Sequence, residues 1–211
     1  MLSKKSTIIF DFDGTLVDTM HIFADVASDL ISANYSIEKD RARKMYFETS
    51  GFPFHKQLEI MFPGLEMNKK IAPLYETQKL DATADIGIDR ETREALSLLK
   101  KSGYDLVISS NNFQYNIDNF INGNKLAKIF ALALGHRPSF SKGLEHFSHI
   151  ALELAKEKEE MIFIGDSLND ARLAKEYGID FVGKLGTFKK QDFVKLDNKI
   201  KVIKAISDLI S

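Results

Sequence analysis

The chain contains no cysteine. It can therefore form neither disulfides nor zinc–thiolate sites, and catalysis by a thiolate is excluded. No apolar run reaches the roughly 18 residues that a membrane-spanning helix needs. The N-terminal apolar run follows two lysines, but it meets acidic residues too early for a secretory signal. We therefore expect a cytoplasmic protein that does not enter a membrane.

The chain also has no large excess of either charge, since it contains 29 basic and 30 acidic residues and its net charge is −1. This balance argues against nucleic acid or an acidic membrane surface as the main partner. The hydrophobic content of 44% and the charged content of 28% are ordinary for a globular protein. The length allows one large core together with a small inserted domain. We expect a monomer or a small homo-oligomer.

Five short apolar runs have the continuous pattern of strands that are covered on both faces. They span residues 6–12, 104–110, 128–134, 160–166 and 179–185. Helical patterns separate the later strands, and residues 198–211 show the spacing of a last amphipathic helix. Strands that alternate with helices predict an α/β fold with a Rossmann-like parallel sheet.

The segment from about residue 17 to residue 87 breaks this alternation, because it contains helical patterns and no good strand. About 70 residues are too many for an ordinary connection between two strands. The sequence therefore predicts a helical domain, at residues 17–86, inserted into a Rossmann-like core made of residues 1–16 and 87–211.

Polar side chains gather where the predicted strands end, which is where open parallel sheets bind their ligands. The set is Asp11 and Asp13 at the end of the first strand, Ser109, Ser110 and Asn111 at the end of the second, Lys142 after the third, and Asp166 and Asp170 at the end of the fourth. Crowded carboxylates repel one another unless a cation shares the site. Hard oxygen ligands suit Mg²⁺, and a lysine beside a hydroxyl suits a phosphate group.

These residue types can carry out phosphoryl chemistry. A carboxylate can attack phosphorus and form an aspartyl-phosphate, and a second carboxylate two residues away can act as general acid and then as general base. Gly14 allows a sharp turn after the first strand, so that the backbone can approach a ligand. We expect Gly14 and Thr15 to contribute to substrate binding.

The stretch "DFDGTLVDT" resembles the first motif of the haloacid dehalogenase-like superfamily of phosphohydrolases. The resemblance covers almost the whole chain, because "LVISSNN", Lys142 and "IFIGDSLNDARLAKEYGI" resemble the three later motifs in the same order. An insert between the first two motifs matches the helical C1-type cap of phosphoglycolate phosphatase-like members. Such members often have proline after the lysine of the third motif, whereas this chain has Gly143.

The resemblance implies a role for each matched residue. Asp11 would be the nucleophile, and Asp13 would be the general acid and base. Ser109 and Lys142 would bind the phosphoryl group, with Ser110 and Asn111 as further substrate contacts. Mg²⁺ would be held by Asp11, Asp13, Asp166 and Asp170. Asp13 would bind the metal through its backbone carbonyl, and Asp170 would support either the metal or Lys142. Ser110 is the alternative to Ser109. Since dehalogenases lack the second acid, Asp13 favours phosphoryl chemistry.

Several alternatives stay open at this stage. A phosphomutase keeps both acids, and a phospho-aspartate signalling switch also places an aspartate, a hydroxyl and a lysine at strand ends. A loop of the cap could bring His55 to the substrate, although a solvated histidine is at least as plausible. The lysines between Gly183 and Lys195 are expected to form a solvated face. The substrate could be phosphoglycolate, a sugar phosphate, a nucleotide or pyrophosphate.

Overall fold

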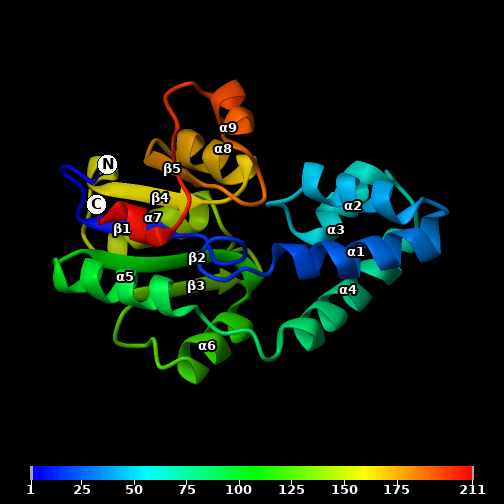
Figure 1. Cartoon of the computed structure of the whole chain (residues 1–211), viewed down its shortest axis with the longest axis horizontal. Helices are drawn as coiled ribbons and strands as arrows, with labels where there is room; N and C mark the ends of the chain where they lie inside the picture. Colours follow the sequence, from blue (N-terminus) through cyan, green and yellow to red (C-terminus); the bar gives the residue numbers. More distant parts are fainter. Residues whose placement is uncertain (1, 211) are drawn as a thin grey trace. The chain divides into compact units, whose positions relative to one another are not determined.

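The structure is a computed structural model that describes residues 2–210, and its strands form one parallel sheet (Figure 1). The strands are β1 (Thr7–Phe10), β2 (Asp105–Phe113), β3 (Leu132–His136), β4 (Met161–Gly165), β5 (Asp180–Lys184) and β6 (Lys201–Ile203). Their order in the sheet is β3-β2-β1-β4-β5-β6. The prediction of an α/β fold with a Rossmann-like parallel sheet is confirmed.

Strand β1 lies in the middle of the sheet, where the strand order reverses. Its last residue, Phe10, is in register with Ile108 of β2 on one side and with Ile164 of β4 on the other. All four residues of β1 are buried, as its continuous apolar pattern predicts. In open parallel sheets, ligands usually bind beyond the carboxyl ends of the strands at such a reversal, which here is the end of β1.

Helices cover both faces of the sheet, as parallel crossover connections require. On one face, Ile8 and Phe10 pack into a core with side chains of α5 (Arg90–Lys101), α6 (Gln114–Gly123) and the 3-10 helix η2 (Ile206–Leu209). On the other face, Ile9 packs into a core with side chains of α7 (Leu144–Glu153) and α8 (Leu168–Tyr177). Successive residues of a strand point to opposite faces, so β1 anchors both cores.

The chain forms two compact units, and the segment Asp18–Ile86 is the smaller one. This unit consists of α1 (Met20–Tyr35), α2 (Lys39–Glu48), α3 (Phe54–Met61) and α4 (Met67–Thr83). It has an apolar core of its own, in which Phe54 stacks on Tyr75 with ring centroids 3.9 Å apart. The chain returns to the sheet unit at Gly87, shortly before α5.

The prediction of a last amphipathic helix over residues 198–211 is wrong. The described part of this segment forms the short strand β6 and then η2. Strand β5 would otherwise present unpaired backbone groups at the sheet edge, and β6 pairs with them from Val182 to Lys184. The apolar residues Ile203, Ile206 and Leu209 are buried in this arrangement. Apolar residues at helical spacing are therefore buried here without forming an α-helix.

The remaining differences concern the ends of elements and three short helices. Strand β3 begins at Leu132, four residues later than predicted, because residues before it form a turn in which Ile129 N–H bonds to the Leu126 carbonyl. No helix was predicted from the sequence at α6, at α9 (Lys190–Leu196) or at the 3-10 helix η1 (Lys158–Glu160).

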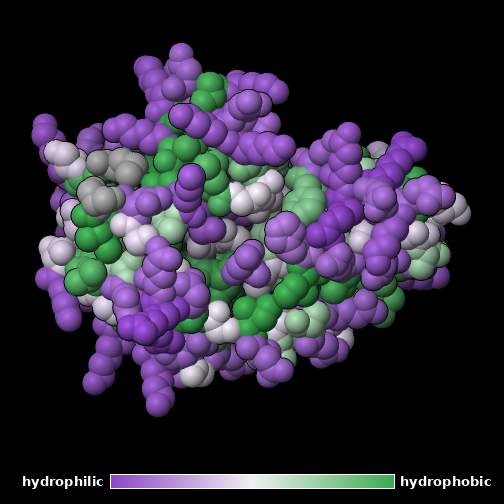
Figure 2. All heavy atoms as spheres, viewed as in Figure 1, coloured by the Kyte–Doolittle hydropathy of each residue, from purple (hydrophilic) through white to green (hydrophobic). Residues whose placement is uncertain are grey.

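The surface in view is covered largely by hydrophilic side chains, with smaller hydrophobic areas between them (Figure 2). Single exposed apolar side chains, such as Leu98 at 49% exposure, are normal on a globular protein. A search of the helices within residues 2–210 finds none that combines the length and the apolarity needed to cross a membrane.

Candidate active site

Lys142 forms the centre of a buried charge cluster at the carboxyl end of the sheet. Its Nζ lies 2.9 Å from Oδ1 of Asp11 and 2.7 Å from Oδ1 of Asp170. The three side chains are at most 7% exposed. The aspartates come from the end of β1 and from the first turn of α8, and the lysine precedes α7. Residues more than a hundred positions apart in the sequence therefore meet at one point.

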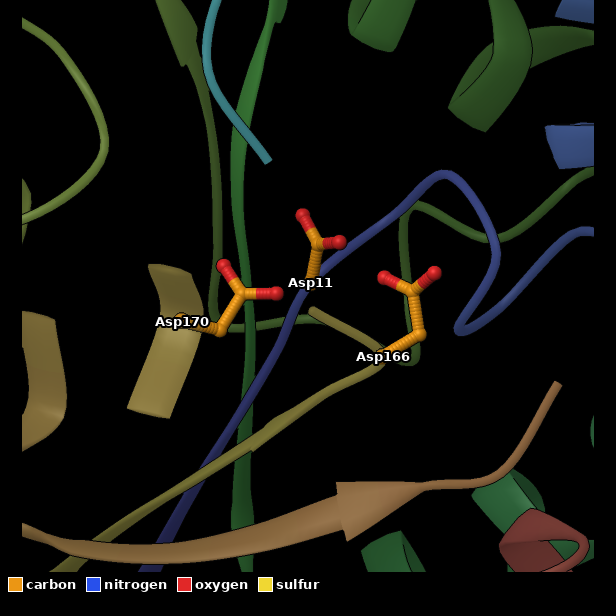
Figure 3. A group of neighbouring side chains, drawn as sticks. All are labelled: Asp11, Asp166 and Asp170. Atoms are coloured by element: carbon orange, nitrogen blue, oxygen red, sulfur yellow. The ribbon is translucent and has the colours of Figure 1, made fainter. Parts of the chain in front are cut away.

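Asp166 completes a group of three carboxylates. One oxygen from each of Asp11, Asp166 and Asp170 can be chosen so that all lie within 4.8 Å of one another. Figure 3 shows the three carboxyl groups side by side, with Asp11 between the other two in this view. All three residues are buried. The structure thus brings together three of the four aspartates that the sequence assigned to the metal.

Local sequence features hold these side chains in place. Gly14 has φ of 80°, which favours glycine, and the turn after β1 is closed by a hydrogen bond from Gly14 N–H to the Val17 carbonyl. Asp170 and Ser167 cap α8 reciprocally, since each accepts a hydrogen bond from the backbone N–H of the other. Gly165 permits this arrangement, because a Cβ at that position would lie 2.7 Å from Asp170 Oδ2.

Burial and neighbouring charges shift the pKa values of Asp11, Asp166 and Lys142. Burial raises the pKa of Asp11 well above its usual range, the ammonium of Lys142 opposes this rise, and the carboxylates of Asp170 and Asp166 add to it. Burial, together with the nearby Asp170 carboxylate, raises the pKa of Asp166 to about 6. Burial alone would lower the pKa of Lys142, but the charges of Asp11 and Asp170 outweigh it and raise that pKa. Such perturbed groups are typical of functional sites.

The donor set fits a hard divalent cation. Three buried carboxylates and one ammonium carry a formal charge of −2 when all are ionised. A cation would relieve the repulsion that adds to the effect of burial on the pKa values of Asp11 and Asp166. Carboxylate oxygens without any cysteine suit Mg²⁺ better than a softer metal. Asp11, Asp166 and Asp170 are therefore the residues that could hold it.

The side chain of Asp13 lies beside β2 and is only partly buried. Its Oδ2 accepts a hydrogen bond from Nδ2 of Asn112, with a nitrogen–oxygen distance of 3.3 Å. Asn112 is thus a site residue that sequence analysis did not single out, although it follows the predicted Asn111 directly. Asn111 itself is partly exposed in β2.

The two candidate serines of β2 have different partners. Ser109 is fully buried, and its Oγ lies 3.0 Å from Nδ1 of His146 in α7. Ser110 Oγ accepts a hydrogen bond from the backbone N–H of Asn112 at 3.0 Å. A hydroxyl that accepts a hydrogen bond keeps its own proton for a further acceptor.

Thr15 and His55 are the two remaining residues that the sequence assigned to substrate binding. Thr15 is 2% exposed in the turn after β1, and its Oγ1 has no hydrogen-bond partner among the described residues. His55 is an exposed residue of α3 in the helical unit.

The end of β5 and the loop after it add two residues that were not predicted from the sequence. Thr187 donates a hydrogen bond to Oδ2 of Asp166. Lys184 Nζ donates a hydrogen bond to the carbonyl of Gly14, 3.1 Å away. The prediction that the lysines of this stretch form a solvated face is therefore wrong for Lys184, which is only partly exposed. Its position at the end of a strand was the signal that could have identified it.

Comparisons with known proteins identify related sequences and similar folds. The sequence is 25% identical over 221 residues to the phosphoglycolate phosphatase of Photorhabdus laumondii, and the match covers 100% of this chain and 93% of the relative. The fold is similar to that of a haloacid dehalogenase-like hydrolase from Streptococcus pneumoniae, with a TM-score of 0.81, 19% identity and coverage of 99% and 98% of the two chains. It is also similar to CbbY from Rhodobacter sphaeroides, solved in complex with phosphate, with a TM-score of 0.74, 18% identity and coverage of 97% and 96%.

A sequence profile of a known hydrolase family also matches residues 8–184. The matched region begins in β1 and ends with β5, so it contains every strand that contributes to the carboxylate cluster. It also contains the four aspartates and the lysine of the predicted site. On these grounds the chain belongs to the haloacid dehalogenase-like hydrolases.

Proposed function

We propose that this hydrolase releases phosphate from a small phosphomonoester, with Mg²⁺ as cofactor and a covalent aspartyl-phosphate at Asp11 as intermediate. One observation carries the proposal: the buried ammonium of Lys142 lies between the carboxylates of Asp11 and Asp170. A fixed cation beside a buried carboxylate offers a nucleophile and a binding site for phosphate oxygens in the same place. The phosphoglycolate phosphatase relative supports the same class of substrate.

In the first step, a carboxylate oxygen of Asp11 attacks phosphorus, and the bond between phosphorus and the alcohol oxygen breaks. Asp13 gives its proton to the departing alcohol. In the second step, Asp13 takes a proton from water while the water oxygen attacks phosphorus, and the bond to Asp11 breaks to release inorganic phosphate. The hydrogen bond from Asn112 orients the Asp13 carboxyl group for both proton transfers.

Asp11, Asp166 and Asp170 would hold Mg²⁺, and the backbone carbonyl of Asp13 remains a fourth proposed ligand. When bound, the ion supplies positive charge that lets carboxylates and phosphate oxygens approach one another. Thr187, through its hydrogen bond to Asp166, orients one of these carboxylates.

For the phosphate-binding hydroxyl we propose Ser110. The Ser109 hydroxyl is already paired with His146, whereas Ser110 accepts a backbone hydrogen bond and keeps a proton to donate. Lys142 contributes the positive charge. The turn with Gly14 and Thr15 contributes backbone groups and a buried hydroxyl.

The test is release of inorganic phosphate from a panel of small phosphomonoesters that includes phosphoglycolate, sugar phosphates and nucleotides. Release should require Mg²⁺ and should be lost in Asp11→Asn. The matched control is Asp118→Asn, which removes the same charge from an exposed position in α6 and should leave the rate unchanged. Release that persists in Asp11→Asn refutes the proposed nucleophile.

The same experiment separates the alternatives. Transfer of phosphate to a second hydroxyl of the substrate, without net release, would identify a phosphomutase. A phospho-Asp11 that persists for minutes without turnover would identify a signalling switch. Both outcomes would overturn the proposed hydrolysis while leaving Asp11 as the phosphate acceptor.

A further inference from the structure

A fully buried hydrogen bond joins β2 to α7. His146 and Ser109 are both 0% exposed, and His146 Nδ1 lies 3.0 Å from Ser109 Oγ. Hydrogen bonds between groups that water cannot reach are held more tightly than those at the surface. The mechanism proposed above uses neither side chain.

This hydrogen bond joins the two elements whose relative position decides where Lys142 lies. His146 belongs to the first turn of α7, and Lys142 comes two residues before that helix begins. Ser109 follows Ile108, which is in register with Phe10 of β1. It therefore lies beside Asp11, the residue after Phe10. The bond thus ties the segment that carries Lys142 to the strand next to the nucleophile.

The surroundings keep His146 in one place and uncharged. The ring of Phe140 packs on its imidazole with centroids 4.5 Å apart. Burial lowers the pKa of His146 to about 3; the carbonyl of Gly135 opposes this change, and the positive charge of Lys142 adds to it. A neutral imidazole has one donor and one acceptor nitrogen, so it can bind a hydroxyl without placing a second cation beside Lys142.

We propose that His146 is a positioning residue: through Ser109 it fixes the start of α7, so that Lys142 stays between Asp11 and Asp170. The inference rests on the proposed phosphatase function, because turnover reports the position of Lys142. It also assigns Ser109 to the support of the site and not to the substrate.

The test is a double-mutant cycle with Ser109→Ala, His146→Leu and the combined variant, measured on the best phosphomonoester. Each single variant should lower kcat by about tenfold to a hundredfold, with a smaller change in KM, because the position of Lys142 matters most when charge moves in the transition state. The double variant should lose no more than either single variant. His146→Asn should retain most of the rate, since its amide can occupy the place of Nδ1.

The matched control is His149→Leu, which changes the same residue type one turn later in α7, where the imidazole also contacts Phe140. It should leave kcat unchanged. If His146→Leu fails to fold, His146→Gln takes its place in the cycle, because the longer side chain puts its amide elsewhere.

Two results would overturn the inference in a wild-type protein that is active and depends on Asp11. Additive losses in the double variant would mean that Ser109 contacts the substrate directly. A lower unfolding midpoint with unchanged kcat would mean that the pair only stabilises the fold. A wild-type protein without any turnover would instead refute the proposed function itself, so the two failures are distinguishable.

Discussion

Replacing Asp166 by asparagine should stabilise the metal-free protein at neutral pH, although it removes a carboxylate that we propose holds Mg²⁺. Asp166 is 2% exposed, and its burial and the Asp170 carboxylate disfavour its charged form. Asparagine has almost the same shape, and its carbonyl oxygen can still accept the hydrogen bond from Thr187. The substitution therefore removes the unfavourable charge and keeps the packing.

The size of the effect follows from the pKa of Asp166. A rise from 3.8 to about 6 lowers the free energy of unfolding by about 3 kcal/mol at neutral pH, because each unit of pKa corresponds to about 1.4 kcal/mol. The folded state binds the proton more tightly than the unfolded state. The stability that this tighter proton binding contributes is therefore fully present below pH 3.8 and is lost as the pH rises to about 6. The gain in Asp166→Asn should follow the same window.

Urea unfolding followed by circular dichroism, with EDTA present, measures this difference. At about pH 8, Asp166→Asn should gain up to about 3 kcal/mol, which in thermal unfolding would raise the midpoint by about 6 to 12 °C. At about pH 4 the gain should nearly vanish. With Mg²⁺ the order should reverse, because binding then stabilises the wild type more. Asp85→Asn, which removes an exposed charge, is the control. A loss of stability at both pH values would refute the reasoning.

Three further substitutions test other parts of the structure. Lys142→Met should lower the free energy of unfolding by about 3 to 5 kcal/mol near neutral pH. The loss should be smaller at acidic pH, because burial raises the pKa of Asp11 and a protonated Asp11 leaves less negative charge unpaired; urea titrations at neutral and at acidic pH check this. Gly165→Ala should destabilise by about 1 to 3 kcal/mol, since its Cβ would lie 2.7 Å from Asp170 Oδ2, and it should also weaken Mg²⁺ binding in calorimetry. Asp89→Ala should cost about 1 kcal/mol in thermal unfolding, because Asp89 Oδ1 accepts the Thr92 N–H at the start of α5; no change would mean that this cap is not needed.

The parts of the fold that the sequence predicted are those in which local pattern and tertiary packing agree. The buried strand β1 and the helices between the later strands all follow from residues close together in the chain. Strand β6 was missed because its three residues become a strand only by pairing with β5. An isolated segment of this length offers no pattern from which that pairing could be read.

The candidate site divides in the same way. The sequence shows the residue types and their place at strand ends, so Asp11, Lys142, Asp166 and Asp170 could be expected near one edge of the sheet. It could not determine the partners of hydroxyls and amides, such as Ser109 with His146 and Asp13 with Asn112. A serine after a strand looks the same whether it binds substrate or supports a helix.

The distribution of charge in the site depends on the assembled fold and cannot be read from the sequence. The pKa values of Asp11 and Asp166 depend on burial and on carboxylates that are far away in the chain. Lys184 and Thr187 join the site because β5 lies next to β4 and its loop reaches the same edge. Covalent neighbours shape turns and caps, whereas electrostatic energy depends on distance in space and on the exclusion of water, which exist only once the sheet and its helices have assembled.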